Sequence, residues 1–332
     1  NNSEDCTQAE EFVLQAIEVM KAIPEAKFER YRELDAILKD DPWALIQDCA
    51  EQNGLDTSNY LDLYNLPFPQ ECTDRLNNSI GVGPHQPIND GNVPLANIDY
   101  YGVEVTNYPD FDNDGSPDSE AEMYQAFREK FIDLASGELE GFQFSCDVPG
   151  STDGTGDIEW DFVPVTTQDG TDFISNDPIA SILLIEASAS GLGDLAADDG
   201  AVIVSDFTNN DWTIATIYTD NNGTQPFSGN RQWGWLINQN GDFEFFTRAV
   251  DVANISKLLN VWPSPANTEC QQDTYYNIAE ATWENMQQEI AVWINSNGGQ
   301  ANIIPKNAVR IDREKIVELL TSNETISEIN CN

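Results

Sequence analysis

The sequence has few of the residues on which most hydrolases and metal clusters depend. Its single histidine, His85, lies in a Pro- and Gly-rich segment without a nucleophile motif. Its six cysteines form no C-x-x-C pair. Ser-His-Asp catalysis, Cys-His catalysis and zinc clusters are therefore not predicted. The sequence also lacks a phosphate-binding loop and a dinucleotide fingerprint.

Basic residues and long apolar runs are scarce as well. The chain has 15 Lys and Arg against 58 Asp and Glu, a formal net charge of −43. Such a surface repels nucleic acid and anionic membranes, so neither is expected as a partner. No run approaches the ~18 apolar residues of a membrane-spanning helix. A solvated acidic shell accounts for most of the charge, and cation binding is the more specific alternative.

Hydrophobic residues are plentiful. They make up 40% of the 332 residues, including 8 Trp and 15 Phe, so a sizeable core is expected. The length fits two domains or one large α+β domain with a helical extension.

The number and spacing of the cysteines indicate an oxidising compartment. An even count, scattered spacing and terminal placement favour up to three disulfides, with six free thiols in a cytosolic protein as the alternative. The polar stretch 1–5 suits the start of a processed mature chain and is compatible with a lipid-anchored cysteine upstream. The expected location is extracellular or on the outer cell surface. The cysteines are Cys6, Cys49, Cys72, Cys146, Cys270 and Cys331.

Patterns along the chain predict an α+β protein in which a helical N-terminal unit is followed by an antiparallel sheet packed by helices. Residues 1–55 form the helical unit, with three short helices. Residues 56–97 are rich in Pro and Asn and are expected to be a linker or long loop. Residues 98–332 form the α+β domain.

Within this domain, Ser119 and Glu122 form a capping box at the start of a helix. The apolar stretch 179–189 follows Asp177-Pro178 and is expected to be a helix, with a buried strand as the alternative. Strands are predicted at 98–106, 141–146, 158–166, 201–206 and 212–219, helices at 120–135 and 274–295, and a last helix from Asp312.

A hairpin rich in Trp and Phe is expected at the centre of the sheet. Asn240-Gly241 lies between two aromatic runs, and such a pair is the strongest short-range hairpin signal. A two-residue turn there places Leu236 opposite Phe245. The same register places Trp235 opposite Phe246 and Trp233 opposite Arg248.

The most specific chemical motif is the acidic stretch 110–118. Its carboxylates occupy loop positions 1, 3, 5 and 9, with glycine at position 6 and a backbone carbonyl at position 7. This stretch resembles the calcium loops of EF-hands, dockerins and thrombospondin type 3 repeats, and the resemblance implies Ca²⁺. Position 12 departs from that pattern, because it is Ala121 rather than glutamate; an acidic turn that ends in a helix cap is the alternative. The predicted ligands are Asp110, Asp112, Asp114, Ser116 and Asp118.

The last third of the chain resembles a module of secreted or surface proteins of bacteria. SGNRQWG (228–234) and FEFFTRAVD (243–251) precede a helix that leads to NSNGGQA (295–301). The module has glycine at the position of Ala249 and arginine at the position of Val252. The resemblance implies an extracytoplasmic location and a fold unit, without an activity. From the residues themselves, Asn230, Arg231, Arg248 and Asp251 are expected to form an Arg–carboxylate network that closes the sheet, with ligand orientation as the alternative.

These features favour a secreted or cell-surface binding or structural protein that is stabilised by calcium and disulfides. It would belong to an extracellular assembly with a protein or glycan partner, and an enzymatic role is less favoured. One alternative is a secreted carboxylate-based hydrolase acting on polysaccharide, although nothing singles out a catalytic pair and Asp161 and Glu186 are only guesses. Another is a toxin or effector delivered to another cell. A deep cleft with two facing carboxylates would favour the hydrolase, and a flat apolar patch the binding protein.

Overall fold

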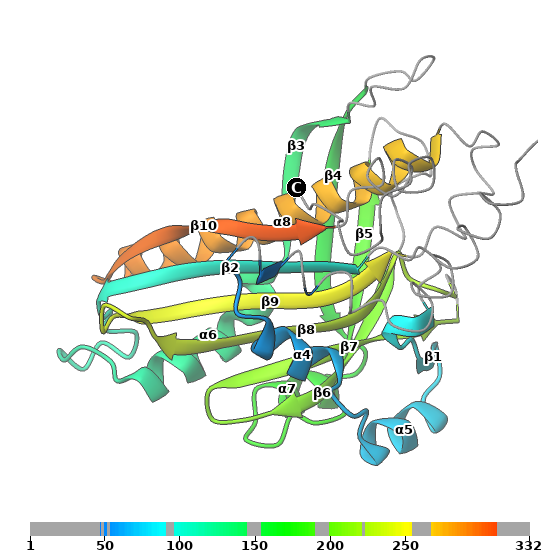
Figure 1. Cartoon of the computed structure of the whole chain (residues 1–332). Coiled ribbons are helices and arrows are strands. Elements are labelled where there is room, and N and C mark those ends of the chain that lie inside the picture. Colours follow the sequence, from blue (N-terminus) through cyan, green and yellow to red (C-terminus); the bar gives the residue numbers. More distant parts are fainter. Residues whose placement is uncertain are drawn as a thin grey trace, which may run out of the picture.

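The computed structural model describes residues 47, 50–51, 54–90, 96–144, 154–189, 199–220, 223–253 and 267–310. They form an α+β fold around a curved, antiparallel sheet of ten strands, as Figure 1 shows. The strand order is β10-β2-β9-β8-β7-β6-β5-β4-β3, and β1 pairs with β7. The strands are β1 (Val82–His85), β2 (Ala96–Asn107), β3 (Gly137–Phe144), β4 (Gly154–Pro164), β5 (Ile182–Ala189), β6 (Gly200–Phe207), β7 (Asp211–Thr219), β8 (Phe227–Ile237), β9 (Phe243–Ala253) and β10 (Gln300–Arg310).

Helices cover both faces of the sheet. The inner face packs against α6 (Glu120–Ala135) and the long helix α8 (Asn267–Ser296), around buried aromatic residues such as Phe131, Trp212 and Trp233. The outer face carries α4 (Thr57–Tyr64), which contacts β8 and β9, and α5 (Gln70–Asn77). The short elements η1 (Ile88–Asp90) and α7 (Thr167–Phe173) complete the described structure. The antiparallel α+β architecture predicted from the sequence is therefore confirmed.

Helix α6 begins and ends where the sequence predicts. The Ser119 side chain accepts from the Glu122 backbone N–H, and the Glu122 carboxylate accepts from Ser119, so the capping box is complete. Helix α8 ends at Ser296, and Gly298 follows with a positive φ of 80°. These helix boundaries are set by short-range backbone hydrogen bonds, which the local sequence encodes directly.

The predicted register of the central hairpin is wrong by one residue. Trp235 pairs with Phe245 and Leu236 with Glu244. The two strands are joined by a five-residue loop, 238–242, in which the Asn238 carboxamide oxygen accepts from the backbone N–H groups of residues 240 and 242. The predicted pairs of Trp235 with Phe246 and Trp233 with Arg248 are displaced in the same way. A shift of one residue exchanges the two faces of a strand. As a result Trp233, Trp235, Phe243 and Phe245 share the inner face.

The helix expected at 179–189 is wrong, because residues 182–189 form β5 between β4 and β6. Its first residues are buried, Ile182 in the outer core and Leu183 in the inner core. Both sides of the strand are therefore apolar there, and the polar alternation that marks a strand is absent.

The segment 56–97 is not a long loop. It contains α4, α5 and β1, and Cys72 and Leu76 of α5 pack into the outer core. Cys72 is a free, buried thiol that donates to the Val204 carbonyl at 3.3 Å. The prediction of up to three disulfides is therefore wrong at its upper limit, because three disulfides would need all six cysteines, including Cys72. The predicted helices of residues 1–55, the helix from Asp312 and the side chains of the other five cysteines lie outside the described residues, apart from helical positions 47, 50 and 51.

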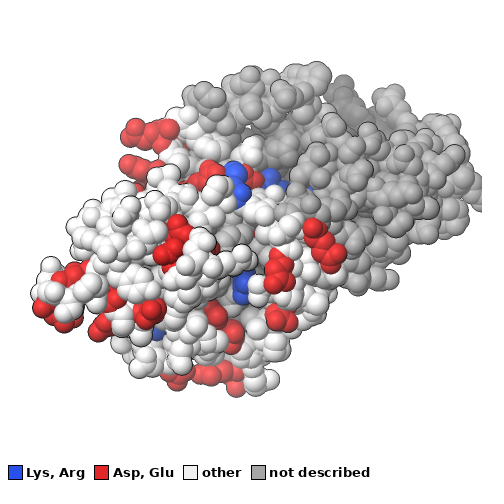
Figure 2. Space-filling view, turned by 60° about the vertical axis from the view of Figure 1, so that its left-hand side comes forward, with Lys and Arg blue, Asp and Glu red and all other residues white. Residues whose placement is uncertain are grey.

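Acidic side chains are scattered over the face shown in Figure 2, where Lys and Arg are few. None of the described helices is both long enough and apolar enough to span a bilayer.

Candidate functional site

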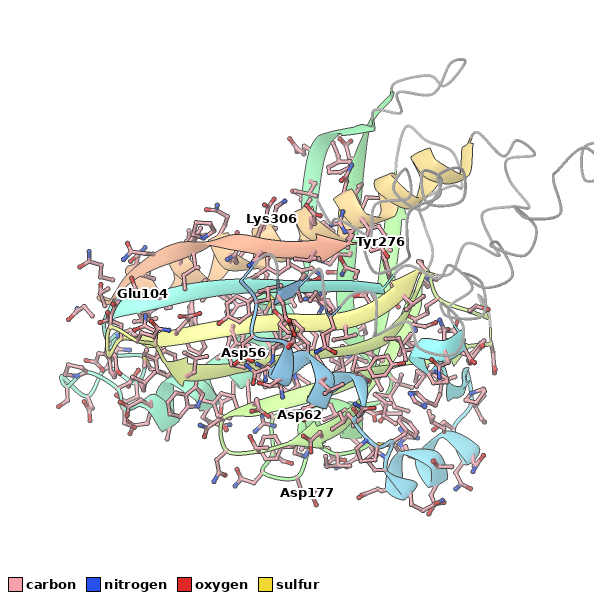
Figure 3. All side chains as sticks on the ribbon, in the orientation of Figure 1. Asp56, Asp62, Glu104, Asp177, Tyr276 and Lys306 are labelled. Carbon is pink, nitrogen blue, oxygen red and sulfur yellow. The ribbon has the colours of Figure 1, made fainter. Side chains whose placement is uncertain are left out.

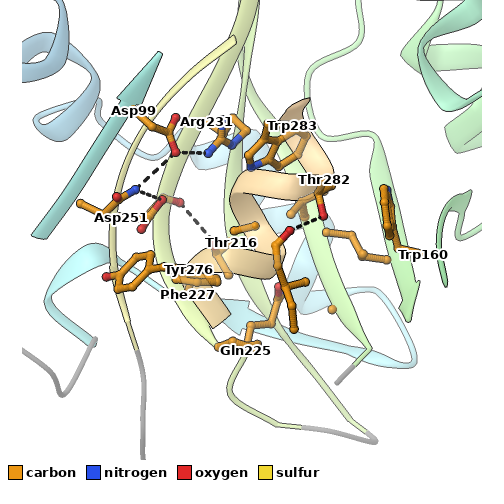
Figure 4. Close-up of a pocket in the computed structure, with 18 of the residues that line it drawn as sticks. Asp99, Trp160, Thr216, Gln225, Phe227, Arg231, Asp251, Tyr276, Thr282 and Trp283 are labelled. Atoms are coloured by element: carbon orange, nitrogen blue, oxygen red, sulfur yellow. Dashed lines mark hydrogen bonds and ion pairs between the residues drawn. The ribbon is translucent and has the colours of Figure 1, made fainter. Parts of the chain in front are cut away.

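A cavity of about 220 Å³ lies between α8 and the inner face of the sheet. Figure 4 shows that Trp160 lies at one side of this cavity and Asp99 and Asp251 at the other. The side of the cavity formed by β4, β5 and β6 is lined by aliphatic and aromatic side chains. Helix α8 covers the cavity opposite the sheet. The apolar lining includes Ile158, Trp160 and Phe162 of β4, Ile185 and Ala187 of β5, Val202 of β6, and Ile278 of α8.

Polar side chains gather at the opposite end, on β2, β9, β8 and β10. Strand register brings them together: Asn97 lies opposite Asp251, and Asp99 lies opposite Ala249, which in turn lies opposite Arg231. Ala249 is almost fully buried, and its methyl group leaves room for Arg231 to reach across β9 to Asp99.

Arg231 makes two hydrogen bonds and one ring contact at this end. Its Nη2 atom donates to Asp99 Oδ2 at 2.7 Å, and its Nη1 atom donates to Thr247 Oγ1 at 3.3 Å. The guanidinium carbon lies 4.1 Å from the ring centroid of Trp283 on α8. The ion pair is buried on both sides, so its two partners depend on each other for charge compensation.

Arg310 closes the polar end from β10. It forms an ion pair with Glu280 of α8, donates from Nε to Asn97 Oδ1 at 2.9 Å, and lies 4.3 Å above the ring of Tyr276. Lys306, labelled in Figure 3, precedes Arg310 on β10. Its ammonium group forms ion pairs with Glu280 and Glu284. These contacts join β10 and α8 along the edge of the cavity.

Asp251 is the least compensated acid of the group. Its Oδ2 atom accepts a long hydrogen bond of 3.4 Å from Asn97 Nδ2, and its Oδ1 atom is buried without a donor among the described residues. Loss of hydration, followed by the charge of the nearby Asp99, raises the pKa of the Asp251 carboxyl to about 7, although Arg231 acts in the opposite direction. Asp251 therefore holds a proton more readily than an ordinary aspartate.

Residues of the SGNR and TRAVD stretches build much of this end. A side chain at Gly229 would collide with the carbonyl of Val250, so glycine permits the close approach of β8 to Asp251 on β9. Asn230 donates to the Leu63 carbonyl at 2.9 Å, which fixes α4 to β8. The expected Arg–carboxylate network is present for Arg231, with Asp99 as the partner. Arg248 lies on the opposite face of β9 and donates to Gln232.

Sequence reasoning did not identify Asp99, Asn97 or Arg310 as site residues. A signal for two of them was present on β2, where Asn97 and Asp99 alternate in phase with the buried residues Tyr101, Val103 and Val105. A carboxylate in phase with a buried strand face requires a partner. Arg310 had no such signal, because no strand was predicted over residues 300–310.

The acidic loop 110–118 is a separate candidate site for a metal ion. Asp110, Asp112 and Asp118 each offer a carboxylate oxygen within 4.8 Å of the others. Asp118 is buried, and loss of hydration, followed by the charges of neighbouring carboxylates, raises its pKa although it accepts from the Phe111 N–H. The group could hold a metal ion.

The other two predicted ligands lie differently. Asp114 accepts from the Ser116 N–H at 2.8 Å, and its carboxylate is not among the three that come together. Ser116 is exposed at the tip of the loop. The loop is joined to α8, since Asp110 N–H donates to the Asn297 carbonyl and Phe111 stacks on Trp293 at 4.1 Å.

The guessed catalytic pair does not line the cavity. Asp161 and Glu186 lie opposite each other on β4 and β5, and both are exposed. They face away from the inner side of the sheet, where Trp160 and Ile185 are directed.

Comparisons with known proteins add little. No protein-family model matches the sequence, and no curated protein matches it. One solved structure with a similar arrangement is the di-domain ARO/CYC protein StfQ from the steffimycin biosynthetic pathway, with 9% sequence identity and a TM-score of 0.36. The match covers 61% of this chain and 52% of that chain, so it spans about half of the StfQ chain. A similarity at this level carries no argument about function.

Proposed function

We propose that the protein binds an apolar small molecule in the cavity between α8 and the sheet. The observation that carries this proposal is the composition of the cavity: a hydrocarbon and aromatic wall on β4, β5 and β6 faces a cluster of charged groups on β2, β8, β9 and β10. Ligand sites in proteins combine a mostly apolar lining with a few convergent polar groups. A ligand would be held by burial of its apolar body and oriented by its polar end.

This geometry favours binding over polysaccharide hydrolysis. Two carboxylates, Asp99 and Asp251, do line the cavity. Asp99 is nevertheless tied to Arg231, and the opposite wall presents Ile158, Phe162 and Val202 rather than groups that hydrogen-bond sugar hydroxyls. A glycosidase needs its two carboxyl groups on either side of one bond, with a polar sugar between them.

We also propose that the acidic loop binds Ca²⁺. Three carboxylates that gather beside a backbone turn form a set of hard oxygen ligands, which suits Ca²⁺ better than softer metals. The ion would have a structural role, because the loop connects the start of α6 to the end of α8. The proposed setting is extracellular or at the outer cell surface, as the acidic composition and the cysteine pattern suggest.

Fluorescence titration with N-phenyl-1-naphthylamine, an uncharged probe that becomes bright in apolar surroundings, tests the binding proposal. The wild-type chain should give a saturable signal. Ala187→Trp should weaken binding about tenfold or more, because the indole would fill space beside Ile185 and Val202.

Ser188→Trp is the matched control for this experiment. Ser188 is the next residue on β5 and is exposed on the other face of the sheet. Its substitution should leave binding unchanged while adding the same side chain to the same strand. Equal binding by both variants, or no saturable binding by the wild type, would refute the cavity as the binding site.

A further inference from the structure

Among the described residues, Arg231 and Arg310 at the polar end of the cavity each form an ion pair within the protein. Arg231 donates to Asp99 and Thr247 and stacks on Trp283. Arg310 is paired with Glu280 and bonded to Asn97. An anionic ligand would therefore compete with Asp99 for Arg231 and with Glu280 for Arg310.

Two buried acceptor atoms of residues at this end have no donor among the described residues. Asp99 and Asp251 both line the cavity end, and the Oδ1 atom of each is buried and receives no hydrogen bond from the described residues. Asp99 as a whole is 4% exposed. A buried acceptor without a donor costs about 1–3 kcal/mol, so a ligand that brings a donor to these two oxygens relieves that cost.

The charges of the described residues at this end are also unbalanced. Acids outnumber bases by one when both aspartates are ionised, and one positive charge from a ligand would neutralise the group. Without such a charge, a proton on Asp251 serves the same purpose, in agreement with its raised pKa. The charged groups are Asp99, Asp251, Glu280 and Glu284 against Arg231, Arg310 and Lys306.

We propose that the cavity takes an apolar molecule that carries an amine, with its ammonium group between Asp99 and Asp251 and its apolar body against β4, β5 and β6. This inference rests on the proposed binding function and specifies the chemical class of the ligand. A hydroxyl group could donate one hydrogen bond but would leave the charge uncompensated. A carboxylate or phosphate would add negative charge beside two acids.

Three probes with the same apolar body test the inference: 4-phenylbutylamine, 4-phenylbutan-1-ol and 5-phenylpentanoate. Each would compete with bound N-phenyl-1-naphthylamine at pH 8. The amine should displace the fluorophore at a concentration about tenfold or more below that of the alcohol, and the carboxylate should be the weakest. The amine advantage should shrink at pH 5.5, because Asp251 gains a proton while an alkylamine stays charged.

The variant Asp251→Asn separates charge from packing. It keeps the shape of the side chain, so within this variant the amine should lose most of its advantage over the alcohol. An alcohol or carboxylate that binds as tightly as the amine would overturn the inference, as would an amine advantage that persists in Asp251→Asn. Either result would contradict the amine specificity but not the proposal that the cavity binds an apolar molecule. No saturable binding of the fluorophore or of any probe would overturn the binding function as well.

Discussion

Ala249 controls whether the buried ion pair can form. Asp99 and Arg231 lie on strands that are not neighbours, and Ala249 of β9 lies between them. A side chain larger than methyl at this position would lie in the path of the guanidinium group. Separation of the pair would leave a buried charge on each side, which costs several kcal/mol.

Asp251 should make stability depend on pH. An aspartate in the unfolded chain releases its proton near pH 4, whereas the folded protein holds the Asp251 proton up to about pH 7. Between these values the folded state binds the extra proton, so the contribution of this group to stability falls as the pH rises from about 4 to 7 and stays low above that range.

Asp251→Asn should remove this dependence, because asparagine has no proton to lose. The melting temperature of the variant should therefore exceed that of the parent by several degrees at pH 8, and the difference should shrink toward pH 4.5. Asp177→Asn serves as the control, since Asp177 is exposed and far from the cavity. Melting differences for Asp251→Asn that are equal at both pH values would contradict this account.

At the scale of elements, short-range sequence signals predicted the helix boundaries correctly. They did not predict the register in which the hairpin strands pair. The capping box of α6 and the glycine after α8 depend on hydrogen bonds within a few residues, so the sequence shows them directly. The hairpin register depends on the Asn238 side chain, whose bonds to the backbone lengthen the loop from two residues to five. A turn motif alone does not reveal such a side-chain bond.

Strands β1, β5 and β10 were not predicted, and β5 and β10 were missed for opposite reasons. Strand β5 starts apolar on both faces, which removes the alternation that marks a strand. Strand β10 lies at the edge of the sheet, is largely exposed and contains Pro305, which edge strands tolerate. Its polar composition gives a weak strand signal. Because the strand was not predicted, Arg310 was not identified as one of the charged groups of the cavity.

The acidic loop should couple calcium to the stability of α6. Asp110, Asp112 and Asp118 repel one another without a cation, and the loop leads into the capped start of this helix. Removal of calcium with EDTA should lower the melting temperature, and it should also change tryptophan fluorescence because Phe111 of the loop stacks on Trp293.

Asp112→Asn should weaken Ca²⁺ binding at least about tenfold in a calorimetric titration while the chain stays folded. Asp177→Asn, which removes an exposed acid elsewhere, should leave it unchanged. If no heat appears at millimolar Ca²⁺ and EDTA leaves the melting curve unaltered, the loop is an acidic turn without an ion.

At the scale of the whole molecule, one sheet organises the described residues. Helices pack on both of its faces, and residues expected to form a linker contribute to the outer core. The net charge of −43 should keep the surface hydrated and should repel anionic partners, while the cavity is mostly apolar. An acidic exterior around an apolar cavity agrees with the proposed binding of an apolar molecule that carries an amine.

A crystal structure of the chain grown with 4-phenylbutylamine tests this account most directly. The phenyl group should lie against Ile158, Trp160 and Val202, and the nitrogen should lie within about 3 Å of carboxylate oxygens of Asp99 and Asp251. Electron density for the amine only outside the space between α8 and the sheet, or an empty cavity at saturating amine, would contradict it.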